Sequence, residues 1–215
     1  MFHPLNLLKE LRRDKSIARI LLNWHIEKYC GNMKGVALDV ASGDPSYYTY
    51  LPKETFKIVR ADYAKSLNPD IVLDMDTLFP FEDGAFDNVL FLNALYIAKS
   101  PERTVKECGR VLKHGGVLYL SSPFIFNESR EPHDYYRFTS EKLEEMLRGA
   151  GFYEVSLVPM GERFTAASFL VGKFLFFWPL RFLLYSAAMF FDSLVPKKIK
   201  TLHPCPVGYF CIARK

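Results

Sequence analysis

Acidic and amide side chains stand at the ends of several apolar runs that have the length of β-strands. Asp39, Asp62, Asp74 and Asn93 each follow or end such a run. In an open α/β sheet, ligands bind beyond the carboxyl ends of the strands, so these side chains are candidates for one ligand site. A carboxylate after the second strand can accept hydrogen bonds from both hydroxyls of a ribose. One after the third strand can accept from the exocyclic amine of a base.

The turn after the first run reads Asp39-Val-Ala-Ser-Gly-Asp-Pro45. A phosphate-binding turn directs helix N–H groups at the anion. Here Pro45 has no N–H, and Asp44 has the wrong charge for an anion. Gly43 still lets the backbone come close to a ligand. The turn therefore favours a cationic, phosphate-free ligand such as S-adenosylmethionine (SAM), which carries a sulfonium, an ammonium and a ribose.

The elements that must position these residues alternate along the chain. Apolar runs predict strands at 36–40, 57–62, 70–75, 88–93, 117–122, 153–158 and 207–214. Helical periodicity predicts helices over 5–29, 101–112 and 140–148, the last with Thr139 as its N-cap, and residues 113–116, KHGG, read as a turn. The alternation predicts an α/β fold, Rossmann-like, with a mostly parallel sheet.

Three segments, in order, resemble the class I SAM-dependent methyltransferases (type 11-like). "VALDVASGD" is similar to the family's first motif, usually LDxGxGxG. "IVLDMDTLFPFEDGAFDNVLFLNAL" resembles its D-x-x-x-LPF-x-DGSFD segment with the following strand, and "RTVKECGRVLKHGGVLYLSSP" its E-x-x-RVLKPGG-x-L-x-x-x-P segment. The resemblance runs from about residue 34 to 158, and the last strand also fits. It implies a seven-stranded sheet whose last strand is antiparallel, and SAM as the cofactor.

The resemblance also implies which residues bind the cofactor. Asp39 and Gly43 would hold the methionine end, Asp62 the ribose, Asp74 and the backbone near Met75 the adenine, and Asn93 the sulfonium side, with Ala41 and Tyr63 also among the cofactor-binding residues. Each Asp has an alternative role as an ordinary turn or cap residue.

The chain departs from the family pattern in four places. Ala41 and Pro45 replace the first and third glycines of the turn, His114 replaces the usual Pro of KPGG, and Tyr96-Ile97 stands where many relatives have Glu-His. These departures motivate an alternative function, a non-catalytic SAM-binding or membrane-associated adaptor with a methyltransferase fold. A nicotinamide oxidoreductase is a weaker rival, because the acidic turn and the extra terminal strand argue against it.

The segment "SREPHDYYRFT" (129–139) follows the fifth predicted strand. It resembles a PHDYYRFT signature of one branch of these methyltransferases, several of them linked to glycan or lipid loci. As an acceptor pocket it would supply aromatic surfaces, Arg137 to hold an anion, and His133 or Asp134 to take a proton, with His133 as the candidate base. Alternatively it is a lid in which Asp134 and Arg137 pair with each other. Methyl transfer from a sulfonium forces no catalytic side chain.

The block 164–195 is strongly apolar, yet Lys173 and Arg181 interrupt it, so no uncharged run reaches the roughly 18 residues of a spanning helix. Pro179 is expected to divide the block or kink it. It predicts a hairpin in a membrane interface, with Trp178 and the cations near headgroups and Lys197, Lys198 and Lys200 facing anionic lipid. A dimer interface, or a cap over the protein's own sheet, is the alternative.

These segments divide the chain into an N-terminal helical segment (1–34), a SAM-binding domain (35–160 with 205–215) and an apolar insertion (161–204). The net charge of +4 is too small to indicate nucleic acid, and neither the four cysteines nor the five histidines have metal-ligand spacing. The charged N-terminus is unlike a signal peptide. We expect a cytoplasmic protein, peripheral on the membrane, with no metal, a small-molecule or lipid-linked acceptor, and an oligomeric state that the sequence leaves open.

Overall fold

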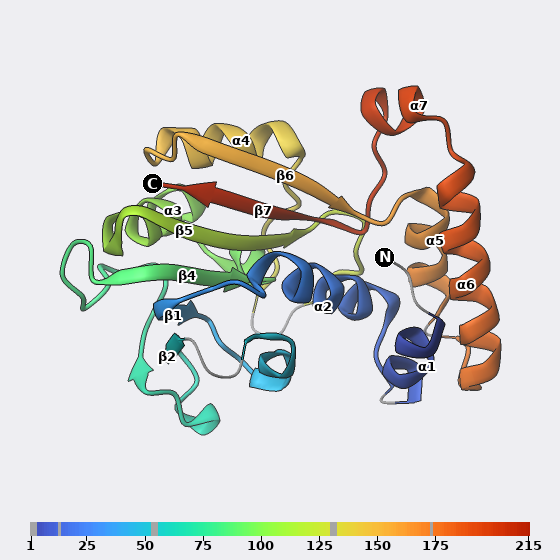
Figure 1. The fold of residues 1–215 in the computed structure, drawn as a ribbon, viewed down its shortest axis with the longest axis horizontal. Helices are drawn as coiled ribbons and strands as arrows, with labels where there is room; N and C mark the ends of the chain where they lie inside the picture. The colour runs from blue at the N-terminus through green and yellow to red at the C-terminus, as the bar shows by residue number, and fades with distance from the viewer. Residues whose placement is uncertain (1–3, 13, 53–55, 130–132, 173) are drawn as a thin grey trace.

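The computed structural model describes residues 4–12, 14–52, 56–129, 133–172 and 174–215. Its centre is a seven-stranded sheet in the order β3-β2-β1-β4-β5-β7-β6 (Figure 1). The strands are β1 (Gly35–Val40), β2 (Phe56–Asp62), β3 (Ile71–Val72), β4 (Phe86–Leu92), β5 (Leu112–Pro123), β6 (Glu154–Met160) and β7 (Gly208–Arg214). The pairs among β1 to β5 are parallel, and β7 runs antiparallel to both neighbours. The predicted fold class is confirmed.

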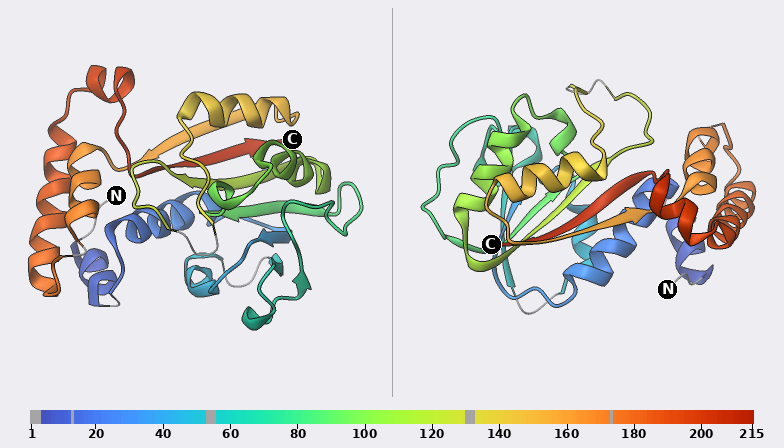
Figure 2. Two further views of the ribbon diagram at one scale, coloured as in Figure 1. Left: turned by 180° about the vertical axis from the view of Figure 1, so that it is seen from behind. Right: turned by 90° about the horizontal axis from the view of Figure 1, so that it is seen from above.

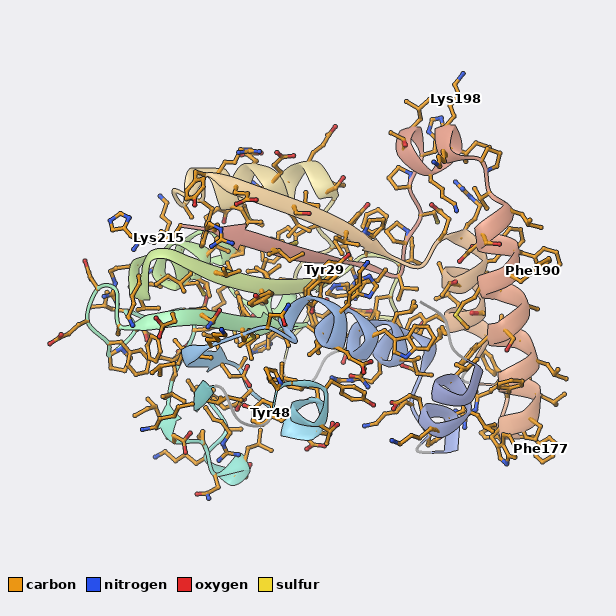
Figure 3. All side chains as sticks on the ribbon, in the orientation of Figure 1. Tyr29, Tyr48, Phe177, Phe190, Lys198 and Lys215 are labelled. Carbon is orange, nitrogen blue, oxygen red and sulfur yellow. The ribbon has the colours of Figure 1, made fainter. Side chains whose placement is uncertain are left out.

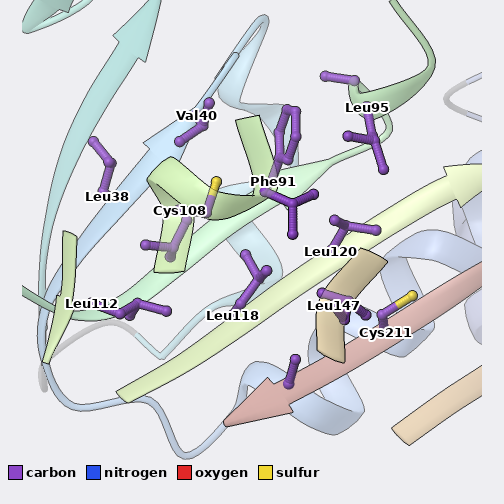
Figure 4. Close-up of a cluster of buried hydrophobic side chains, with 14 of the residues drawn as sticks. Leu38, Val40, Phe91, Leu95, Cys108, Leu112, Leu118, Leu120, Leu147 and Cys211 are labelled. Carbon is purple, nitrogen blue, oxygen red and sulfur yellow. The ribbon is translucent and has the colours of Figure 1, made fainter. Parts of the chain in front are cut away.

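Helices cover both faces of the sheet, as Figure 2 shows from above. Helices α3 (Pro101–Val111) and α4 (Ser140–Gly149) cover one face, and α2 (Ile17–Cys30) covers the other. Since strand side chains alternate, β4 sends Val89 and Phe91 into one core and Leu90 and Leu92 into the other. Figure 4 shows the first of these cores. Burial on both faces explains why the central strands are apolar throughout.

Three predicted elements differ from the structure. The predicted helix 5–29 is two helices, α1 (Pro4–Arg12) and α2, because Asp14 has a left-handed backbone (φ 56°) and the Ser16 side chain caps α2 at the Arg19 N–H. The strand predicted at 70–75 is only Ile71–Val72, because the Asp74 side chain accepts from the Asp76 N–H and turns the chain. The predicted KHGG turn lies inside β5, where the pairing with β4 shifts register.

The apolar block forms α5 (Arg163–Gly172) and α6 (Trp178–Leu194), followed by α7 (Lys197–Leu202). Pro179 lies in the first turn of α6, so it divides the block as predicted. The buried Asp192 carboxylate accepts from the N–H groups of Phe164 and Thr165 at 2.9 and 3.1 Å, which caps α5 and joins the two helices. This α5–α6 hairpin stands across the sheet beyond the carboxyl ends of β4 and β5 (Figures 1 and 2). It therefore lies beside the edge where ligands bind.

None of the helices within the described ranges combines the length and the apolar character that a membrane crossing requires.

Candidate cofactor and acceptor site

The turn after β1 holds a left-handed backbone at both Ala41 (φ 57°) and Gly43 (φ 53°). Apart from its two chain neighbours, no atom of the described residues lies within 4 Å of where a Cβ on Gly43 would stand, so the loop leaves open space there. Ala41 adopts a conformation that costs an alanine roughly 1 kcal/mol relative to glycine. The geometry of a glycine-type loop is thus retained in spite of the alanine.

Asp39 is the penultimate residue of β1 and is completely buried. Tyr47 and Tyr48, from the short 3₁₀ helix η1 (Pro45–Tyr50), both donate their hydroxyl hydrogen bonds to its Oδ2. Oδ1 is also buried and has no hydrogen-bond partner among the described residues. Burial raises the pKa of Asp39 to about 7, although the two tyrosine hydroxyls oppose the shift. A buried acceptor atom without a partner is costly, and a cationic ligand would satisfy it.

Asp62, at the end of β2, connects the loop to the second strand. Its Oδ2 accepts from the Gly43 N–H and its Oδ1 from the Ala64 N–H, both at 2.8 Å. Each carboxylate oxygen has a second lone pair, so both can still accept from a ribose hydroxyl. These two bonds orient Asp62 for the role predicted for it.

A cavity of about 210 Å³ lies at the ends of β2 and β3. Its lining includes Tyr63, Asp74 and Met75, three residues that the sequence assigned to the cofactor, together with Asp76, Ile97, Lys99 and His133. The structure thus brings the predicted adenine-side residues together. Asp39, Gly43 and Asp62 lie at the adjacent strand ends. The residues fit SAM on two observations, the unpartnered Asp39 oxygen and the open space at Gly43.

Asn93 lies on the other side, one residue beyond β4. It has a left-handed backbone (φ 58°) and its N–H bonds to Ser121 O of β5 at 3.0 Å. It lines a separate cavity of about 120 Å³ with Ser16, Arg19, Pro123 and Phe126. The predicted cofactor residues therefore divide between an adenosine side and a side that faces α2 and the loop after β5.

The three predicted catalytic residues do not converge on one point. Asp134 and Arg137 form a two-point ion pair, with 2.6 Å from Nη2 to Oδ2, and the Asp134 side chain is 3% exposed. This pair lowers the pKa of Asp134, which opposes a role as a base. His133 stacks on Tyr135 and lies in the adenosine-side cavity. The geometry favours the lid alternative for Asp134 and Arg137.

Tyr96 anchors this lid. The sequence singled out this position only because Tyr96-Ile97 stands where many relatives have Glu-His. Its carbonyl accepts from the N–H groups of Tyr135 and Tyr136 at 3.0 and 3.2 Å. Its ring lies under the Arg137 guanidinium at 5.5 Å. Tyr47 and Tyr48 were also missed. The run of aromatics directly after the loop was the available signal, but only the folded chain shows that they reach Asp39.

Comparisons with known proteins agree with this fold. Residues 38–120 match the family described as a methyltransferase domain. A Haloferax volcanii methyltransferase, solved in complex with the Trm112 activator, aligns with a TM-score of 0.64 at 17% identity over 90% of this chain and 88% of that one. The [4+2]-cyclase SpnF aligns with 0.61 at 17% over 90% and 79%, and a SAM-dependent methyltransferase from Archaeoglobus fulgidus with 0.60 at 16% over 92% and 94%. No curated protein matches the chain.

Residues 38–120 match the methyltransferase-domain family, and the whole chain has the fold of the class I methyltransferases. SAM is the cofactor that this domain indicates, and the resemblance seen in the three sequence segments is confirmed.

Proposed function

We propose that this protein transfers a methyl group from SAM to an amphipathic acceptor, lipid-linked or glycan-type, presented at a membrane surface. The observation that carries the proposal is the exposed apolar face of the α5–α6 hairpin, which adjoins the strand ends that form the site.

The outward residues of α6 recur every three or four positions and are apolar with the exception of Ser193. The apolar ones are Trp178, Leu180, Leu183, Ala187, Phe190, Phe191 and Leu194. A surface helix of a globular protein normally turns its polar face outward, so this pattern is reversed. The stripe continues through the connection between the helices, where Phe176 is 92% exposed. Figure 3 shows Phe177 and Phe190 directed away from the body of the protein.

The charged residues of α6 point inward instead. Arg181 pairs with Asp14, and its side chain is 13% exposed, while Asp192 caps α5. Arg181 therefore does not lie on the exposed face of α6, and its place near headgroups stays a prediction; Lys173 is outside the described residues. With both charged groups turned inward, the outer face of α6 is apolar enough to enter a bilayer interface.

Basic residues stand beside the apolar face. Lys197 and Lys198 are exposed on α7, which also carries Lys200. Each lysine near an anionic surface contributes about 1 kcal/mol to membrane binding. The apolar face of α6 and the lysines of α7 together suit the interface between water and an anionic bilayer better than they suit bulk water. A cap over the protein's own sheet explains the inner face of the hairpin only.

The site residues supply position rather than acid–base chemistry. SAM, when bound, supplies a methyl group already activated on a sulfonium. Asp39 would hold the ammonium end and Asp62 the ribose, so that the reactive end faces the Asn93 side. In-line positioning and exclusion of water give most of the rate in such a transfer. His133 stays a candidate base by prediction alone.

Flotation with liposomes tests the membrane part. The protein should float with vesicles containing anionic lipid, and Phe190→Glu should abolish flotation. Tyr153→Glu is the matched control, because Tyr153 is 64% exposed and precedes β6 at the opposite end of the sheet from the hairpin. If the wild-type protein stays unbound at low salt, or elutes as a dimer that Phe190→Glu splits, the membrane reading fails. Labelled SAM with a membrane lipid extract then identifies the fraction that gains the methyl group.

A non-catalytic adaptor is the second candidate, and one observation favours it. Tyr47 and Tyr48 already occupy one oxygen of Asp39, so the loop's own side chains use part of its capacity to bind a cation. Calorimetry with SAM and S-adenosylhomocysteine separates the two functions. No binding of either compound would leave only the adaptor.

A further inference from the structure

We propose that a cavity beneath the α5–α6 hairpin binds the acceptor's apolar chain, with a phosphate of the same molecule held by Arg181. This inference rests on the proposed function and names the acceptor class, a lipid with a phosphate headgroup. The cavity measures about 520 Å³, within the usual range of roughly 300–1,000 Å³ for small-molecule sites.

The lining of this cavity has an apolar half and a polar half, the latter made of Asp14, Ser16, Asn127, Glu128, Ser129 and Arg181. Phe126 of the loop after β5, Phe169 of α5, Leu175 and Phe176 of the connection, and Tyr185 of α6 contribute its carbon surface. The rings of Phe126 and Phe169 stack at 4.7 Å. A Cβ on Gly172 would stand 2.5 Å from the Tyr185 hydroxyl, so glycine is required for Tyr185 to line the cavity. Such a surface fits an acyl or isoprenoid chain.

Arg181 is a cation in this lining, which also contains the acidic Asp14 and Glu128. It bonds to Asp14, whose side chain is 83% exposed. Its Nε is buried and has no hydrogen-bond partner among the described residues. A guanidinium with a spare buried N–H suits a phosphate, which can take several of its donors at once. Asp14 is then the group with which the phosphate competes.

The cavity leads toward the side of the site where Asn93 lies. Ser16 and Phe126 line both this cavity and the smaller one that contains Asn93. At its other end lies the connection between α5 and α6, where Phe176 belongs to the outer apolar face. A molecule bound in this cavity with its phosphate at Arg181 would thus extend toward the end of β4.

Direct binding of simple alkyl phosphates tests the proposal without a bilayer and without turnover. Dodecyl phosphate, butyl phosphate, inorganic phosphate and dodecanol are titrated into the full chain by calorimetry, below micelle-forming concentrations. We expect dodecyl phosphate to bind at least tenfold more tightly than the other three, because only it offers both chain and phosphate. Equal affinity of dodecanol would remove the phosphate from the proposal.

Variants of Arg181 and Asp14 test whether the phosphate binds at Arg181. Arg181→Leu should weaken dodecyl phosphate at least tenfold, whereas Lys106→Leu, an equal loss of charge on the exposed side of α3, should change it less than twofold. Asp14→Asn should strengthen binding at least threefold, because it removes the competing carboxylate and asparagine tolerates the left-handed backbone. A gain of affinity cannot result from misfolding. Unchanged affinity in both Arg181→Leu and Asp14→Asn would overturn the site. Flotation and methyl transfer are separate readouts, so the proposed function can fail while this binding persists, and the reverse.

Discussion

The pKa of Asp39 gives a quantitative prediction for cofactor binding. Burial raises this pKa to about 7, and Oδ1 has no partner among the described residues. The ammonium of SAM favours the ionised carboxylate, so binding must remove the proton from Asp39. The affinity for SAM should therefore rise with pH until the carboxylate is ionised in the free protein.

The size of the effect follows from the titration. With a pKa of about 7, about one-tenth of the Asp39 carboxyls are ionised at about pH 6 and about three-quarters at about pH 7.5. The affinity should rise by about eightfold between these values, with about 0.9 proton released per cofactor at about pH 6. The α-amino group of the cofactor loses its own proton at about pH 8, so the window ends there.

Calorimetry in two buffers with different ionisation enthalpies measures both the affinity and the proton release. S-adenosylhomocysteine keeps the ammonium and should show the same trend. Asp39→Asn should bind weakly with a flat pH profile. An affinity that is constant from about pH 6 to 7.5, with no proton release, would refute the assignment of the ammonium to Asp39.

One further prediction concerns the effect of Asp39 on stability, and three concern other positions. The folded protein binds the Asp39 proton more tightly than the unfolded chain does. The unfolding free energy without cofactor should therefore fall as pH rises from about 4 to about 7. Urea denaturation should show this fall in the wild-type protein and its absence in Asp39→Asn. Ala41→Gly should relieve the left-handed strain, raise the unfolding free energy by about 0.5–1 kcal/mol and the melting temperature by about 2 °C; a lower melting temperature would contradict the strain. Asp192→Ala should cost about 2–4 kcal/mol through the lost cap and speed proteolysis between α5 and α6, whereas unchanged cleavage would show that the cap does not hold the hairpin. His133→Ala should weaken SAM a few-fold with kcat unchanged if His133 lines only the adenosine side, and a large loss of kcat would restore the base.

Local sequence patterns predicted much of the fold. The strand at 88–93 and the helix at 140–148 lie within about two residues of β4 and α4, since burial on both faces and a capping Thr139 leave clear local signals. The break at 13–16 escaped the pattern because the helical periodicity continues across it, whereas the Ser16 cap and the Asp14 turn are single-residue features. The assignment of the domain boundaries and of each site residue to its role stays a prediction.

By itself, the sequence determined the class of fold and the kind of ligand. Alternating apolar runs, an acidic turn without phosphate donors, and carboxylates at successive strand ends are local properties, and each of them can be read along the chain. Only the tertiary structure decided which side chains meet. Tyr47 and Tyr48 reach Asp39, Asp134 pairs with Arg137 on the Tyr96 anchor, and Arg181 turns inward to Asp14 across 167 residues of chain. The physical reason is that periodicity tells which face of a helix is apolar, but packing against the rest of the molecule decides whether that face is covered. On α6 it left the apolar face exposed.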